Sequence, residues 1–128
     1  MSTMKQIGIL FLVLLLLLPM TACQGDTDTG EEITLTVKVI HKDKTEKVFT
    51  ITTKATTLLG ALQQENLVEG EDQNGSFYVT SVDGEVADWS VDQGWWSFTK
   101  EGQMLMSGAG STKIADGEVY EITYTIGF

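Results

Sequence analysis

The chain has 128 residues and a formal net charge of −10, from 18 acidic residues against eight lysines and no arginine. An acidic chain without arginine lacks the basic patch that binds phosphates, so its charge argues against nucleic acid as a partner. A single cysteine excludes an intrachain disulfide, so apolar packing alone must stabilise one small domain.

The first 22 residues have the pattern of a secretory signal peptide. Lys5 precedes an apolar run from Ile7 to Leu18, and small residues follow before Cys23. The run is shorter than the ~20 apolar residues that a membrane-spanning helix needs. We therefore predict that residues 1–22 are a signal peptide and not a membrane helix.

The segment Met20-Thr21-Ala22-Cys23 resembles the lipobox of bacterial lipoproteins. The resemblance implies that Cys23 is lipidated, for example with palmitate, and becomes the first residue of a protein held at the extracytoplasmic face of the cell membrane. The competing interpretation is an ordinary signal peptide with an incidental cysteine, which would be a free thiol in an oxidising compartment. Residues 23–32 are then the lipidated cysteine and a flexible acidic spacer.

From residue 33 onward the pattern predicts a domain that covers residues 33–128. Alternating apolar residues predict strands at 33–39 and 48–53, joined as a hairpin. One of the adjacent threonines Thr56 and Thr57 is a candidate N-cap for a helix at 58–67, and residues 70–75 are predicted as a turn. Further strands are expected at 77–82, 95–99 and 119–126. The order β-β-α-β-β-β predicts a small α+β domain, β-grasp-like, with a mostly antiparallel sheet and one helix.

The sequence offers little for catalysis or metal binding. His41 is the only histidine, and we expect it to be a solvated turn residue. No zinc-type ligand set is present. The acids between two predicted strands (Asp83, Glu85, Asp88 and Asp92) are expected to form a solvated acidic loop, although a carboxylate pair for acid–base chemistry stays open. We predict that the protein is not an enzyme and holds no metal.

Aromatic residues give the strongest hint of a binding surface. Trp89, Trp95 and Trp96 lie within eight positions, and neighbouring residues of a strand point to opposite faces. Trp96 and Phe98 are expected on the same face of the strand. We expect one of Trp95 and Trp96 in the core, while the other is either exposed as a binding surface or covered by loops. The following loop, Gln103 to Ser111, mixes methionine with small residues, and such a loop either adapts to an apolar ligand or fills the core.

A family resemblance rests on several of these segments together. They are Gly94-Trp95-Trp96-Ser97-Phe98, Gly102, Gly108–Ser111, Asp116-Gly117-Glu118, Tyr120-Glu121-Ile122, Leu58–Leu62 and Tyr78–Gly84. In order and spacing they resemble the bacterial domain of unknown function DUF4430 and the C-terminal domain of transcobalamin and intrinsic factor. In the transcobalamin family this domain closes over one face of cobalamin while a helical barrel holds the other, and only one short helix is expected here.

The resemblance implies cobalamin as the candidate ligand and no covalent cofactor apart from the lipid. The implied ligand-binding residues are Trp95, Trp96, Ser97, Leu105, Met106, Ser107, Gly108, Ala109, Gly110 and Ser111. Our leading hypothesis is a lipid-anchored binding module that presents cobalamin or a similar large ligand to a membrane transporter. The alternative is a cell-surface module that contacts a surface protein or a polymer.

Overall fold

The structure is a computed structural model, and residues 31–128 of it are described. The predicted signal peptide, Cys23 and nearly all of the predicted spacer lie outside these residues. Within the described part of the chain, no helix has the length and apolar character needed to cross a membrane.

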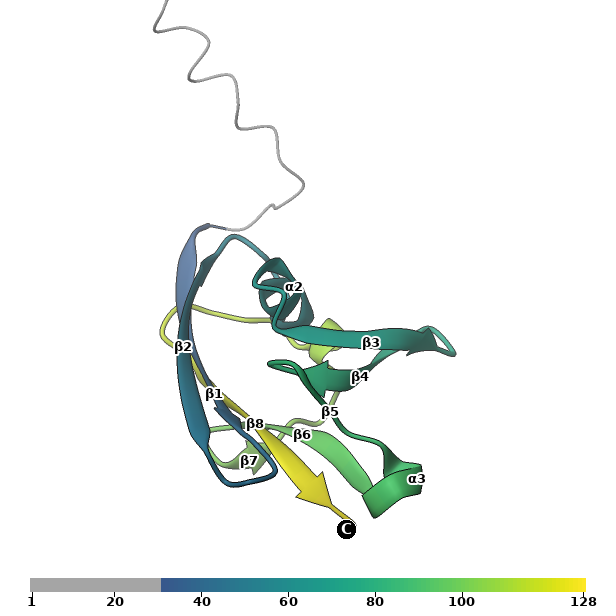
Figure 1. The fold of residues 1–128 in the computed structure, drawn as a ribbon. Helices are drawn as coiled ribbons and strands as arrows, with labels where there is room; N and C mark the ends of the chain where they lie inside the picture. The colour runs from purple at the N-terminus through teal and green to yellow at the C-terminus, as the bar shows by residue number, and fades with distance from the viewer. Residues whose placement is uncertain (1–30) are drawn as a thin grey trace, which may run out of the picture.

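The larger of two sheets has five strands in the order β2-β1-β8-β6-β7 (Figure 1). Its first and last strands along the chain, β1 and β8, are parallel neighbours, and the other pairs are antiparallel. Central parallel strands from the two ends of the domain are the β-grasp arrangement, so the predicted α+β class is confirmed. The strands are β1 (Ile33–Ile40), β2 (Glu46–Thr53), β6 (Gly94–Lys100), β7 (Gln103–Met104) and β8 (Val119–Ile126).

The smaller sheet has three antiparallel strands in the order β3-β4-β5, and it projects to the side of the larger sheet (Figure 1). These strands are β3 (Val68–Gln73), β4 (Ser76–Val82) and β5 (Glu85–Val86). In the described part of the chain the helical elements are short: α2 (Leu58–Gln64), α3 (Trp89–Asp92) and the 3-10 helix η1 (Ala109–Ser111).

The core lies between one face of the larger sheet and a cover made of α2 and the smaller sheet. Alternate residues of β1 and β8 are buried on that face, as their period of two predicts. The helix and β4 supply the opposing apolar side chains. The main buried residues are Leu35, Val37, Val39, Tyr120, Ile122 and Tyr124 from the sheet, and Leu58, Ala61, Leu62, Val79 and Val82 from the cover.

Helix α2 begins where the sequence indicates. The Thr57 side chain accepts a hydrogen bond from the backbone N–H of Gly60 at 3.2 Å. The predicted threonine N-cap is therefore confirmed, and of the two candidates it is Thr57. The helix ends earlier than expected, at Gln64, because Asn66 adopts a left-handed conformation with φ of 53°. Leu67 is therefore outside the helix, although it is still buried in the core.

The predicted turn at residues 70–75 is wrong for most of its length. Residues 68–73 form β3, and only Asn74 and Gly75, with φ of 51° and 84°, make the tight turn to β4. The strand escapes prediction because every residue after Val68 is exposed, so no alternation of apolar and polar residues marks it. Its pairing with β4 defines it instead.

Candidate binding site

Strand β6 places its two adjacent tryptophans on opposite faces of the larger sheet. Trp96 is buried in the core, and its indole N–H donates to the backbone oxygen of Glu85 at 3.2 Å. Trp95 lies on the other face, half-buried, and its indole N–H donates to the backbone oxygen of Gly127 at 2.7 Å. The sequence predicts one core tryptophan in this pair without deciding between them, and in the structure it is Trp96.

Ser97 is also buried, and its hydroxyl is already engaged within the sheet. It donates to the Thr123 backbone oxygen and accepts from the Thr125 hydroxyl at 3.0 Å. Trp96 and Ser97 therefore contribute to the fold rather than to an accessible surface. The candidate ligand surface narrows to Trp95 and the loop after β7.

The loop Leu105–Ser111 runs from the edge of the larger sheet to α2 and the smaller sheet. Leu105 packs against the core and Ala109 is buried, whereas Met106 is 99% exposed. The Leu105 backbone N–H donates to the Phe98 oxygen, and the Thr112 hydroxyl donates to the Gly108 oxygen. Both ends of the loop are thus fixed, and Met106 extends from it into solvent.

Gly108, Gly110 and Ser111 line a depression of about 280 Å³ that we call the loop depression. Its other walls are apolar side chains of α2 and β4 and the tip of the β3–β4 hairpin, namely Leu59, Phe77, Asp72, Gly75 and Ser76. Neither Trp95 nor Trp96 lines it. The structure therefore brings the predicted glycine-containing loop to a cavity, but not together with the predicted tryptophans.

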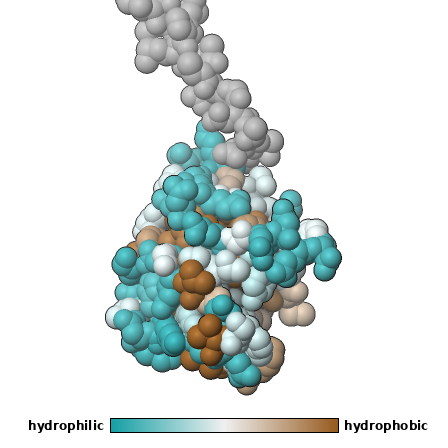
Figure 2. Space-filling view, turned by 45° about the vertical axis from the view of Figure 1, so that its right-hand side comes forward, coloured by the Kyte–Doolittle hydropathy of each residue, from teal (hydrophilic) through white to brown (hydrophobic). Residues whose placement is uncertain are grey.

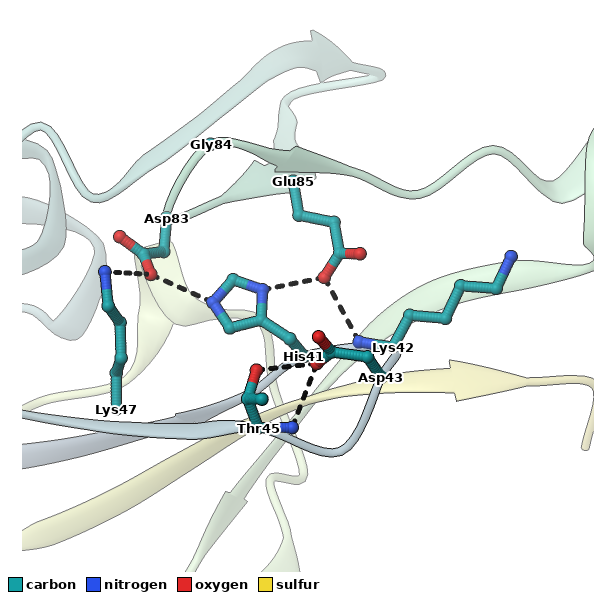
Figure 3. A pocket seen from close by; sticks show the side chains of 8 residues that line it. All are labelled: His41, Lys42, Asp43, Thr45, Lys47, Asp83, Gly84 and Glu85. Carbon is teal, nitrogen blue, oxygen red and sulfur yellow. Dashed lines mark hydrogen bonds and ion pairs between the residues drawn. The ribbon is translucent and has the colours of Figure 1, made fainter.

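His41 is not the solvated turn residue that the sequence suggested. Its side chain is 15% exposed, and each ring nitrogen contacts a carboxylate from the β4–β5 hairpin (Figure 3). Nδ1 lies 2.7 Å from Glu85 Oε1, and Nε2 lies 2.9 Å from Asp83 Oδ2. These contacts lie beside an open depression of about 730 Å³ lined by Lys42, Asp43, Thr45, Lys47 and Gly84 with the three contact residues.

The predicted solvated acidic loop is likewise corrected, because three of its four acids have partners. Besides Asp83 and Glu85, Asp92 pairs with Lys42 at 2.8 Å and accepts from the Tyr124 hydroxyl at 2.7 Å. The hydrogen bonds from Lys42 and Tyr124 lower the pKa of Asp92 below its ordinary value. Only Asp88 fits the expectation of an exposed acid, and it caps α3 through Ser90.

A second exposed apolar surface lies at the opposite end of β6 from the loop. Trp89, Val91 and Phe128 are exposed, and the rings of Trp89 and Phe128 lie 5.1 Å apart. Figure 2 shows separate brown groups in the middle and the lower part of the face, the lower ones at the end where α3 and the end of β8 lie in Figure 1. We call Trp89, Val91 and Phe128 the α3 surface.

Comparison with known protein families shows to which family this chain belongs. Residues 55–125 match the family model described as a domain of unknown function (DUF4430). The chain belongs to the DUF4430 family. No curated protein matches it.

Two solved structures resemble this DUF4430 protein. The crystal structure of an inferred metal-binding protein from Ruminococcus gnavus is 42% identical, with a TM-score of 0.73, and the match covers 76% of this chain and all of that one. Haptocorrin in complex with Cbi is 18% identical, with a TM-score of 0.65 over 84% of this chain. The match spans 28% of the haptocorrin chain, and at this identity it establishes a shared fold. The comparisons support a binding module without specifying its ligand.

Sequence reasoning missed the walls of the loop depression and the partners of His41. The Asn74-Gly75 pair is a hairpin signal that could have placed the hairpin tip. No short sequence pattern predicts that Leu59 and Phe77 line the same depression as Gly110. Likewise, none predicts that His41 contacts residues more than 40 positions away. These contacts depend on how the smaller sheet docks on the larger one.

Proposed function

We propose that this protein is a lipid-anchored, extracytoplasmic binding module that takes cobalamin or a related corrinoid at the loop depression. The observation that carries the proposal is the depression itself, which joins the predicted loop Gly108–Ser111 to apolar walls at Leu59 and Phe77. The fold shared with haptocorrin, whose structure contains Cbi, supports the choice of ligand class.

The chemistry of the loop depression suits the edge of a corrin ring. A corrin is flat and apolar with polar amide groups at its rim, so it needs apolar contact together with backbone hydrogen-bonding groups. Glycines let a ligand approach the backbone closely, and the flexible Met106 side chain is available to cover an apolar surface. A cavity of about 280 Å³ is smaller than a corrinoid, so the domain would contact one side of the ligand.

A membrane transporter is the partner that this one-sided contact favours, since the other side of the ligand stays free for transfer. Anchoring through Cys23 would keep the domain near the bilayer, because a spacer of nine residues spans at most ~30 Å. We further propose that the module is not an enzyme. In support, the one histidine and its two carboxylate neighbours are paired with each other.

A spectral titration of cobalamin with the full chain tests the proposal. We expect saturable binding by the wild type and at least about tenfold weaker binding by Gly108→Leu. Gly108 has an ordinary φ of −64° and a Cβ there meets no atom within 4 Å, so the variant should fold while filling the depression. Val48→Leu, at an exposed position of β2 outside the depression, is the matched control. No binding at millimolar ligand would rule out the corrinoid proposal.

The anchor is tested separately by Cys23→Ser. Because the cysteine thiol is the proposed lipidation site, the variant should be released from membranes or remain an uncut precursor. Fractionation and mass spectrometry of the N-terminus would detect either outcome. A variant that is cut and still membrane-bound would contradict the lipoprotein assignment.

The α3 surface favours a second candidate, a module that contacts a surface protein or a polymer. Exposed tryptophan is enriched at interaction sites, and Trp89 is exposed beside Phe128. Capture of partners from membrane extracts should then be lost with Trp89→Ser and kept with Val48→Leu. Capture that is equal for both variants would count against this candidate.

A further inference from the structure

His41 lies at a contact between the two sheets. It follows β1 of the larger sheet directly, while Asp83 and Glu85 belong to the turn and the strand that follow β4 in the smaller sheet. Figure 3 shows the imidazole between the two carboxylates, with one ring nitrogen directed at each. The indole N–H of Trp96 adds a parallel contact from β6 to the Glu85 backbone.

The two carboxylates select one protonation state of the ring. A neutral imidazole has one N–H donor and one acceptor nitrogen, whereas the protonated ring has two donors. An ionised carboxylate only accepts hydrogen bonds. Both contacts of His41, at 2.7 Å and 2.9 Å, are therefore hydrogen bonds at the same time only when the ring is protonated.

The other charged and titratable groups around the ring lie in the β1–β2 loop and on β2, α3 and β8. Lys47 of β2 lies 3.3 Å from Asp83, and the backbone N–H of Lys42 in the β1–β2 loop donates to Glu85. Asp43 of that loop is bonded to Thr45, while the Lys42 ammonium turns away to Asp92 beside Tyr124 of β8. Of these groups, the carboxylates of Asp83 and Glu85 make the direct contacts with the imidazole.

We propose that His41 is a pH-dependent clamp between the two sheets, closed when the imidazole is protonated and weakened when it loses its proton. Deprotonation removes one donor, so one of the two carboxylates loses its hydrogen bond to the ring. The contact also loses the positive charge between two negative ones. The inference does not depend on which ligand the protein binds.

The direction of the pKa shift agrees with this geometry. Burial alone would lower the pKa of His41, but the hydrogen bonds and charges of Asp83 and Glu85 outweigh it and raise the pKa above 6.5. A raised pKa in the folded state gives stability that is present below the unfolded value and is lost as pH rises through the folded value. Burial would raise the pKa of Asp83, but His41 and Lys47 lower it, so Asp83 stays ionised across that range.

An NMR titration of the full chain in detergent tests the clamp, because His41 gives the single histidine signal. We expect its midpoint above about 6.5, and we expect the backbone amides of Gly84 and Glu85 to shift with the same midpoint. A midpoint at or below about 6.5 would overturn the proposal, and so would amide shifts of Gly84 and Glu85 that do not change with the His41 titration.

Thermal unfolding between pH 5.5 and pH 9 gives the second readout. Each unit by which the His41 pKa is raised corresponds to about a tenfold loss of the folding equilibrium constant over that range. His41→Gln should remove this dependence, and the double variant Asp83→Asn, Glu85→Gln should keep the histidine but lose its raised midpoint. An unchanged pH dependence in His41→Gln would refute the clamp; if the variants fail to fold, the wild-type titration decides.

Discussion

At the scale of single residues, a half-buried carboxylate contributes most to the stability of the fold where it accepts several hydrogen bonds. Glu118 accepts from the backbone N–H of Ala115 and from the Tyr120 hydroxyl, both at 2.7 Å, and it pairs with Lys100. Burial would raise the pKa of Glu118, but these hydrogen bonds outweigh it and lower the pKa. The interaction therefore stabilises the fold above the ordinary pKa of the group and is lost as pH falls through the folded value.

Glu118→Gln should consequently lower the free energy of unfolding by about 1–3 kcal/mol at pH 7, since the acceptor of several charge-assisted hydrogen bonds loses its charge. Urea unfolding measures the change. Glu46→Gln is the control, because Glu46 makes one exposed ion pair with Lys38 at 3.8 Å, worth about 0–1 kcal/mol. Equal destabilisation by the two variants would contradict this account.

At the scale of elements, the β3–β4 hairpin depends on one close backbone contact. The pairing register shifts between Glu69 and Gly70, and a Cβ on Gly70 would lie 2.0 Å from the Tyr78 backbone oxygen. Any side chain at this position must displace one strand from the other. Glycine is therefore required here by space, not by an unusual φ.

Gly70→Ala is expected to destabilise the domain by about 1–3 kcal/mol or more through this overpacking. Gly108→Ala is the matched control, because its Cβ meets open space, and it should be close to neutral. Thermal unfolding of both variants checks the pair. A neutral Gly70→Ala would mean that the hairpin does not hold this register.

The secondary-structure elements differ in how well the sequence predicts them. β1, β8 and the start of α2 were predictable because their buried residues follow a clear period and Thr57 is a good N-cap. β3 was not, since its residues after Val68 are exposed on both faces. The predicted loop does line a cavity, but the other walls of that cavity come from residues distant in the sequence. The partners of His41 are also distant in the sequence, and no local pattern connects them to it.

At the scale of the whole molecule, two sheets share one core, and β4 connects the two features proposed here. Its first residues, Ser76 and Phe77, line the loop depression, and its last residue, Val82, precedes the Asp83 contact with His41. The α3 surface lies apart, at the other end of β6 from the loop. The fold thus separates the two candidate contact surfaces, so one experiment can tell them apart.

Mapping of backbone NMR shifts on adding cobalamin to the labelled full chain tests the central claim most directly. The account predicts that the largest shifts fall at Gly108–Ser111, Phe77 and Leu59, because these residues line the loop depression. Shifts confined to Trp89 and Trp95, or no shifts at saturating cobalamin, would contradict it.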